Sequence, residues 1–194
     1  PARGVTITYR ELEEGSNRGA QLFRSLGLGV GDHIAIMMEN HPSFPVLCWA
    51  AQRAGLYYTA ISYRLQEEEV AYIVEDCGAR LFITSHAQEA LAARVAGRLA
   101  PDVRRFMIDG TIDGFDAWED AVAAMPATPI ADETEGADML YSSGTTGRPK
   151  GIKVALSGAP LGEAGGLLGL ATALYGFDEN VRYLSPAPLY HAAP

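Results

Sequence analysis

The chain has 194 residues, of which 48% are hydrophobic and 20% are charged, and its formal net charge is −9. This composition is typical of a folded chain with one large domain or two small ones, and it excludes a disordered protein. The acidic balance argues against nucleic acid as a partner, because nucleic-acid binders usually carry a basic face.

The apolar stretches are interrupted well before the ~20 residues that a membrane span needs, so we expect no transmembrane segment. The first residues have no apolar core, and we expect no signal peptide. Cys48 and Cys77 lack metal-like spacing and are predicted to be plain thiols in a reducing compartment. We therefore expect a cytoplasmic protein, with peripheral attachment to a membrane left open.

Strand-like and helix-like patterns alternate along most of the chain. The predicted strands are residues 5–8, 33–38, 57–61, 80–84, 104–108, 137–141, 152–156 and 181–184. The predicted helices are residues 8–26, 40–54, 65–77, 87–99, 115–125 and 163–174. Two helix starts have identifiable signals: Thr8 with Glu11 three residues later forms a capping box, and Asn40 is a candidate N-cap ahead of Pro42.

The alternation predicts an α/β fold, a doubly wound and mostly parallel sheet with flanking helices. The apolar run 33–38 suits a strand covered on both faces of such a sheet. We expect residues 1–136 to form an N-terminal α/β subdomain. Residues 137–194 would hold a phosphate-loop strand and the start of a second subdomain, truncated at Pro194.

The segment from Tyr141 to Gly151 reads YSSGTTGRPKG, between two apolar runs. Glycines let a backbone approach an anion closely, hydroxyls add neutral donors, and a lysine supplies a compact cation. The segment is therefore a candidate phosphate-binding loop, strand-loop-strand in form. The spacing differs from a Walker A motif, in which the lysine is followed by Ser or Thr and opens a helix. A kinase-like NTPase is disfavoured for that reason.

This string resembles the phosphate-binding signature of the adenylate-forming superfamily, which includes acyl-CoA synthetases, peptide-synthetase adenylation domains and firefly luciferase. The segments 8–12 (TYREL) and 31–35 (GDHIA) look like the opening of that family, and 188–191 (PLYH) resembles a segment that borders the acyl pocket. The resemblance covers nearly the whole chain. It implies the N-terminal part of the large domain of an acyl-CoA synthetase, with long-chain fatty-acid–CoA ligases as the nearest type.

The resemblance also implies roles for individual residues. Those implied to bind ATP phosphates are Ser142, Ser143, Gly144, Thr145, Thr146, Gly147 and Lys150. Lys150 and Thr145 are the implied catalytic residues, with Thr145 also a ligand of Mg²⁺, and Tyr190 and His191 are implied to bind the acyl substrate. ATP, Mg²⁺ and CoA would be the co-substrates. The substrate would be a small carboxylic acid, with a fatty acid expected.

Two features depart from the family pattern. Residues 154–157 (VALS) lack the hydroxyl-His pair that many members carry there. The later glutamate motif, the ribose-binding aspartate and the C-terminal lysine of the family are also absent, so we expect a fragment that is inactive by itself. The alternative hypothesis is a non-catalytic binding or scaffold module derived from the same family, whose exposed apolar surface would favour a homodimer.

Overall fold

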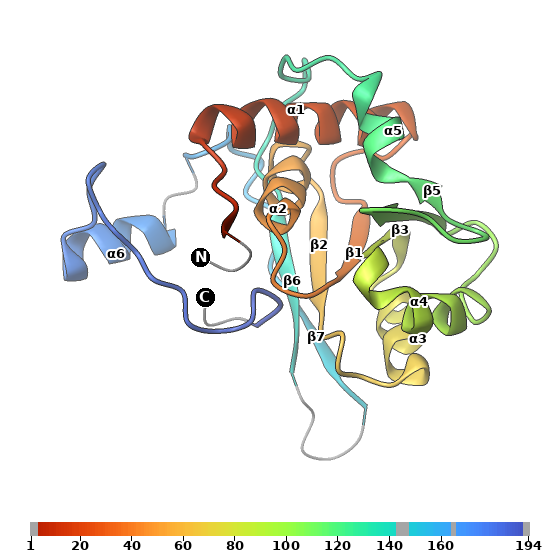
Figure 1. The fold of residues 1–194 in the computed structure, drawn as a ribbon. Helices are drawn as coiled ribbons and strands as arrows, with labels where there is room; N and C mark the ends of the chain where they lie inside the picture. Colours follow the sequence, from red (N-terminus) through yellow and green to blue (C-terminus); the bar gives the residue numbers. More distant parts are fainter. Residues whose placement is uncertain (1–3, 143–147, 164–165, 192–194) are drawn as a thin grey trace.

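The computed structural model describes residues 4–142, 148–163 and 166–191 (Figure 1). Its strands form one seven-stranded sheet in the order β5-β4-β3-β1-β2-β6-β7. The strands are β1 (His33–Met37), β2 (Tyr57–Ile61), β3 (Ala79–Ser85), β4 (Arg104–Ile108), β5 (Asp116–Ala117), β6 (Ala137–Ser142) and β7 (Lys150–Lys153). All neighbouring pairs are parallel except β6 and β7. The expected doubly wound, mostly parallel sheet is confirmed.

Helices cover both faces of this sheet (Figure 1). They are α1 (Tyr9–Ser25), α2 (Ser43–Arg53), α3 (Glu67–Asp76), α4 (Glu89–Ala96) and α5 (Trp118–Ala123), with a short 3₁₀ turn at His86–Gln88. A sixth described helix, α6 (Gly166–Tyr175), does not cover either face. Side chains of α1, α2 and α5 share one buried cluster with the sheet, and those of α3 and α4 share the other. The protein therefore has two hydrophobic cores, one on each face.

The central strand β1 supplies both cores. Ile34 and Ile36 belong to the cluster under α1 and α2, and Ala35 and Met37 belong to the cluster under α3 and α4. Successive side chains of a strand point to opposite faces, so a strand buried on both sides must be apolar throughout. The apolar run at residues 33–38 is continuous because β1 is buried on both faces of the sheet.

The helix starts agree with the sequence in one case and differ in another. Thr8 and Glu11 form the predicted capping box, in which the Glu11 N–H donates to Thr8 Oγ1 (3.2 Å) and the Thr8 N–H donates to Glu11 Oε2 (2.8 Å). The predicted N-cap role of Asn40 is wrong, because α2 begins after Pro42. Asn40 Oδ1 instead accepts a hydrogen bond from the Leu189 N–H (2.8 Å) and so holds the C-terminal segment.

Two predicted strands are not formed. Residues 5–8 and 181–184 have no strand partner in the described structure. The apolar side chains of Val181, Tyr183 and Leu184 are instead largely exposed. Their apolar character favoured a strand, but a strand also requires a neighbour with free backbone groups.

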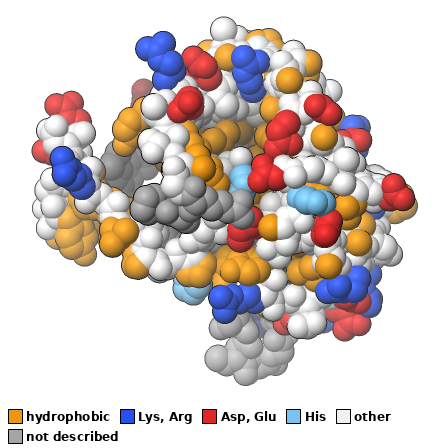
Figure 2. All heavy atoms as spheres, viewed as in Figure 1, with side chains coloured by type: hydrophobic (Ala, Val, Ile, Leu, Met, Phe, Trp, Pro, Cys, Tyr) orange, Lys and Arg blue, Asp and Glu red, His pale blue; other side chains and the backbone are white. Residues whose placement is uncertain are grey.

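The last helix, α6, lies to the side of the sheet at the left of Figure 1. Its side chains Leu170, Leu174 and Tyr175 are 52%, 63% and 75% exposed. In Figure 2, hydrophobic side chains gather at the left of the molecule, over α6. Among the residues that the structure describes, no helix is both long and apolar enough to cross a membrane.

The first strand after residue 136 joins the same sheet as the preceding ones. In β6, Ala137 and Asp138 pair with Tyr57 and Tyr58 of β2. The division of the chain into residues 1–136 and 137–194 stays a prediction.

Candidate functional site

Gly136 sets the position of β6 beside β2. Its N–H donates to the Gln52 carbonyl (2.7 Å), and the next N–H, of Ala137, donates to the Leu56 carbonyl (3.1 Å). A Cβ atom at Gly136 would lie 2.2 Å from the Leu56 carbonyl oxygen and 2.9 Å from that of Ala51. Only glycine allows this approach of two backbones, and the approach fixes where β6 enters the sheet.

Strands β6 and β7 form the antiparallel hairpin that carries the candidate phosphate loop. Ser142 and Lys150 face each other in its last pair, and both are exposed. Because β6 runs parallel to β1 and β2, this pair lies at the carboxyl ends of the parallel strands, the edge where open α/β sheets bind ligands. The other predicted phosphate-binding residues, Ser143, Gly144, Thr145, Thr146 and Gly147, lie outside the described residues.

Helix α3 anchors both sides of the hairpin. The Tyr141 hydroxyl donates to Asp76 Oδ2 at 2.5 Å. The Tyr72 hydroxyl lies 3.2 Å from Asp76 Oδ1 and 3.3 Å from the Pro149 carbonyl oxygen. The Arg148 guanidinium lies over the Tyr72 ring, 4.9 Å from its centroid. The residues just before and just after 143–147 are therefore held by one helix.

Gly151 gives the Tyr141 side chain the space that it occupies. A Cβ atom at Gly151 would lie 2.3 Å from Met139 Cε and 2.9 Å from Tyr141 Cζ. Burial and the hydrogen bond to Asp76 raise the pKa of Tyr141, so the phenol stays a neutral donor at physiological pH. The glycine that follows Lys150 in the motif thus serves the packing of the hairpin.

The second lysine, Lys153, lies at the opposite end of β7 from Lys150. Lys153 Nζ donates to His33 Nε2 (2.9 Å) and lies 4.4 Å from the centroid of the Tyr57 ring. His33 and Tyr57 are the first residues of β1 and β2, so this cluster lies at the amino ends of the parallel strands. Burial, and then the nearby Lys153 charge, lower the pKa of His33 to about 4.

A pocket of about 330 Å³ lies on the α2 face of the sheet, and we call it the aromatic pocket. Its walls come from α2, β2, β6 and the C-terminal segment. The lining residues are Phe44, Pro45, Cys48, Trp49, Tyr58, Ala60, Asp138, Leu140, Tyr183, Ser185, Leu189, Tyr190 and His191. Both residues predicted to bind the acyl substrate are therefore in one pocket.

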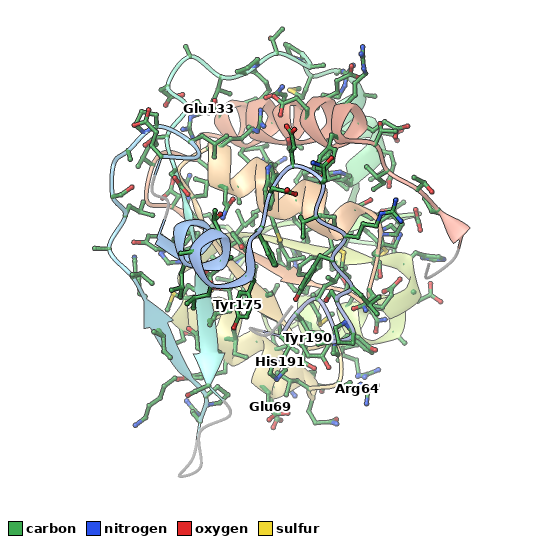
Figure 3. The ribbon with its side chains drawn as sticks, turned by 90° about the vertical axis from the view of Figure 1, so that its left-hand side faces the viewer. Arg64, Glu69, Glu133, Tyr175, Tyr190 and His191 are labelled. Carbon is green, nitrogen blue, oxygen red and sulfur yellow. The ribbon has the colours of Figure 1, made fainter. Side chains whose placement is uncertain are left out.

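A ring contact with the loop after β2 positions Tyr190, and a turn within its own segment positions the backbone of His191. The Tyr190 ring packs edge-on against Tyr63, with centroids 5.6 Å apart. The His191 N–H donates to the Pro188 carbonyl (2.9 Å). In the side-on view of Figure 3 the two side chains lie near Arg64, next to the start of α3.

The aromatic pocket and the hairpin lie on one face of β6. Asp138 and Leu140 line the pocket, and Ser142 continues this row because alternate residues of a strand share a face. Lys150, opposite Ser142, belongs to the same face. A ligand could extend from the pocket toward the loop along this row.

The sequence did not identify Cys48, Trp49, Tyr58 or Asp138 as site residues. The helix and strand patterns predicted that Cys48, Trp49 and Tyr58 are core residues. Asp138 did carry a signal, since it is a charged residue inside an otherwise apolar strand. Within residues 4–142, 148–163 and 166–191, no group of three His, Cys, Asp or Glu side chains could hold a metal ion. The predicted Mg²⁺ ligand Thr145 lies outside the described residues.

The chain is similar to several known proteins. A family profile described as AMP-binding enzyme matches residues 2–194. A 3-hydroxybenzoate–CoA ligase of Aromatoleum sp. (strain CIB) is 32% identical over 151 residues, which are 76% of this chain and 29% of the relative. A crotonobetaine/carnitine–CoA ligase of Escherichia coli O17:K52:H18 is 32% identical over 156 residues, 76% of this chain and 30% of the relative.

Solved structures show the same fold. The anthranilate CoA ligase AuaEII, in complex with anthranoyl-AMP, superposes with a TM-score of 0.66 at 25% identity, covering 75% of this chain and 29% of that one. The apo structure of Mycobacterium smegmatis MbtA gives a TM-score of 0.64 at 28% identity, covering 77% of this chain and 29% of that one. The chain thus spans less than a third of the length of these relatives.

Proposed function

Because the chain belongs to the family of AMP-binding enzymes, we propose that it is part of an AMP-forming acid–CoA ligase. The carboxylate of the acid attacks the α-phosphorus of ATP, giving an acyl adenylate and pyrophosphate. The CoA thiol then displaces AMP and forms the thioester. The observation that carries this proposal is the row on β6, which joins the aromatic pocket to the phosphate-loop pair Ser142 and Lys150.

The residues divide between two tasks. Ser142, Lys150 and the residues between them bind the phosphates of ATP, where Lys150 offsets the charge that builds up on the leaving pyrophosphate. Thr145 remains the proposed contact to Mg²⁺, which would supply charge neutralisation on the phosphates when it is bound. Tyr190 and His191 bind the acid, and a donor at His191 offsets the charge of its carboxylate.

The acid is a small-molecule carboxylic acid. The relatives are named for 3-hydroxybenzoate and for crotonobetaine or carnitine. The candidate substrates therefore include acids other than fatty acids. A short fatty acid is one candidate for a pocket of about 330 Å³. The chain spans about 30% of the length of those ligases, and we propose that it has no ligase activity by itself. We also propose that it resides in the cytoplasm, with peripheral attachment to a membrane left open.

Phosphate binding is tested with the two lysines of the chain. Lys150→Ala should weaken binding of a fluorescent ATP analogue by tenfold or more, since a charge-assisted hydrogen bond contributes about 1.5–3 kcal/mol. Lys153→Met is the matched control, because Lys153 contacts His33 at the other end of β7. Equal affinities for Lys150→Ala and the unmodified chain would contradict the assignment. Acid-dependent pyrophosphate exchange by the chain at about 1 s⁻¹ or faster would refute the proposed inactivity.

A binding or scaffold module is the second candidate, and the exposed side chains of α6 favour it. Leu170, Leu174 and Tyr175 present an apolar surface that another copy of the chain could cover as a homodimer. Sedimentation equilibrium separates the candidates. A monomer that binds ATP supports the ligase fragment, whereas a stable dimer without ATP affinity supports the module.

A further inference from the structure

We propose that the aromatic pocket selects carboxylic acids that carry an ammonium group, which Asp138 and the surrounding aromatic rings hold. This inference rests on the proposed function only in treating the pocket as the site of the acid. Acids with an ammonium group are a narrower class than the carboxylic acids of the proposed function.

Asp138 is a half-buried carboxylate without a counter-ion. Among the described residues, no hydrogen-bond donor or cation pairs with it. Other carboxylates of the chain are paired, for example Asp32 with Arg80 at 2.6 Å and Asp132 with Arg24 at 3.1 Å. A ligand that fills the pocket would remove this carboxylate from water, which costs free energy without a partner, and an ammonium group on the ligand would offset that cost.

The negative charge of Asp138 acts on its neighbours in the pocket. Burial raises the pKa of the Cys48 thiol to about 12, and the charge of Asp138 adds to this effect. Burial also raises the pKa of the Tyr58 phenol, with smaller contributions from Cys48 and Asp138. Both groups therefore stay neutral at physiological pH, and Asp138 remains the one carboxylate among the lining residues. Since the described lining residues include neither Lys nor Arg, their charge favours a cation in the pocket.

The remaining walls suit the same ligand group. Trp49 and Tyr58 line the pocket. The faces of aromatic rings attract an ammonium ion through their negative charge distribution. Ser185 Oγ is buried and has no hydrogen-bond partner in the described part of the chain. An ammonium group has three N–H donors, enough for Asp138 and for an additional oxygen. An alkyl tail would leave these oxygens unpaired.

The volume limits the length of the acid. A cavity of about 330 Å³ is near the lower end of the range for small-molecule sites, which is about 300–1,000 Å³. It suits an acid with a short spacer between its carboxylate and its ammonium group. His191, at the same pocket, can donate to the carboxylate.

The test compares two acids of nearly equal shape, 5-aminopentanoate and hexanoate, in which an NH₃⁺ group replaces a terminal CH₃ group. Binding to the chain is followed by the fluorescence of Trp49, which lines the pocket and is 44% exposed. The other tryptophan, Trp118, is buried against Phe23 and Phe106 and gives a constant background. We expect 5-aminopentanoate to bind at least tenfold more tightly than hexanoate.

Asp138→Asn keeps the shape of the side chain and removes its charge. We expect this variant to lose the tenfold preference, to bind hexanoate at least as well as before, and to melt at the same or a higher temperature. Asp132→Asn is the matched control and should keep the preference, because Asp132 pairs with Arg24 away from the pocket.

The outcomes separate the two proposals. Equal affinity for the two acids, or a preference that survives Asp138→Asn, overturns the ammonium selection and leaves the pocket as an acid site. If neither acid binds, both the selection and the assignment of the pocket are overturned, while ATP binding at Lys150 would still stand.

Discussion

Replacing Tyr141 by Phe removes one hydroxyl group from the base of the phosphate-loop hairpin. The hydroxyl donates to Asp76 Oδ2 at 2.5 Å, and a hydrogen bond to a charged group contributes about 1.5–3 kcal/mol. This pair is partly exposed and Tyr72 still reaches the same carboxylate, so we expect a loss of about 1 kcal/mol in the free energy of unfolding. For a chain of this length, that loss corresponds to a Tm lower by roughly 2–4 °C.

Urea unfolding followed by circular dichroism measures this loss. A double-mutant cycle with Asp76→Ala isolates the pair, and we expect a coupling energy of about 1 kcal/mol. Tyr9→Phe is the matched control, because the Tyr9 side chain is 91% exposed. A Tyr141→Phe variant as stable as Tyr9→Phe, or a coupling energy near zero, would refute the anchoring of the hairpin on α3.

The same variant changes the alkaline limb of the stability curve. The pKa of Tyr141 is raised in the folded state. The neutral phenol therefore makes its full contribution to the free energy of unfolding below a pH of about 10, where the unfolded phenol is also protonated. Above that pH the unfolded state loses the proton first, and stability falls. Tyr141→Phe should lose less stability between pH 9 and pH 11 than the unmodified chain does.

Three further predictions concern the scaffold of the site, each measured by urea unfolding. Gly136→Ala should cost about 3 kcal/mol because its Cβ would overlap the Leu56 carbonyl, whereas Gly29→Ala, with open space around its Cβ, should change stability by less than about 0.5 kcal/mol. The pKa of His33 is lowered to about 4, so the neutral imidazole contributes fully to the free energy of unfolding above pH 6.5, and this contribution is lost as the pH falls toward 4. The unmodified chain should lose on the order of 2 kcal/mol of stability over that range, and His33→Gln should not show this loss. Thr8→Ala should cost about 1 kcal/mol through the lost capping box, and an unchanged midpoint would contradict that role.

Much of the fold could be predicted because its signals are local. The run 33–38 and the strand Tyr57–Ile61 are visible as apolar stretches, and the capping box at Thr8 marks a helix start by spacing alone. Asn40 shows the limit of such signals. Its side chain can cap a helix or accept from a distant backbone N–H, and only the folded chain brings Leu189 to it.

The candidate site could be predicted in part for the same reason. The motif at 141–151 and the segment 188–191 are local strings, and the structure places Tyr190 and His191 together in one pocket. The directions of Lys150 and Lys153 could not be predicted, since they depend on the antiparallel register of β6 and β7. The proposed role of Asp138 depends on the absence of a pairing cation among the described residues. A sequence pattern does not show which side chains lie near a carboxylate in the folded chain.

The strand order has a consequence for how the chain folds during synthesis. Each strand up to β5 joins an edge of the sheet that already exists: β2 beside β1, β3 on the other side of β1, and then β4 and β5 outward. The free edge of β2 must wait until β6 has been made. During that interval an open edge of Tyr57–Ile61 can template pairing with another nascent chain. A ribosome-bound chain that stops before Ala137 should therefore aggregate more readily than one that extends beyond Lys153.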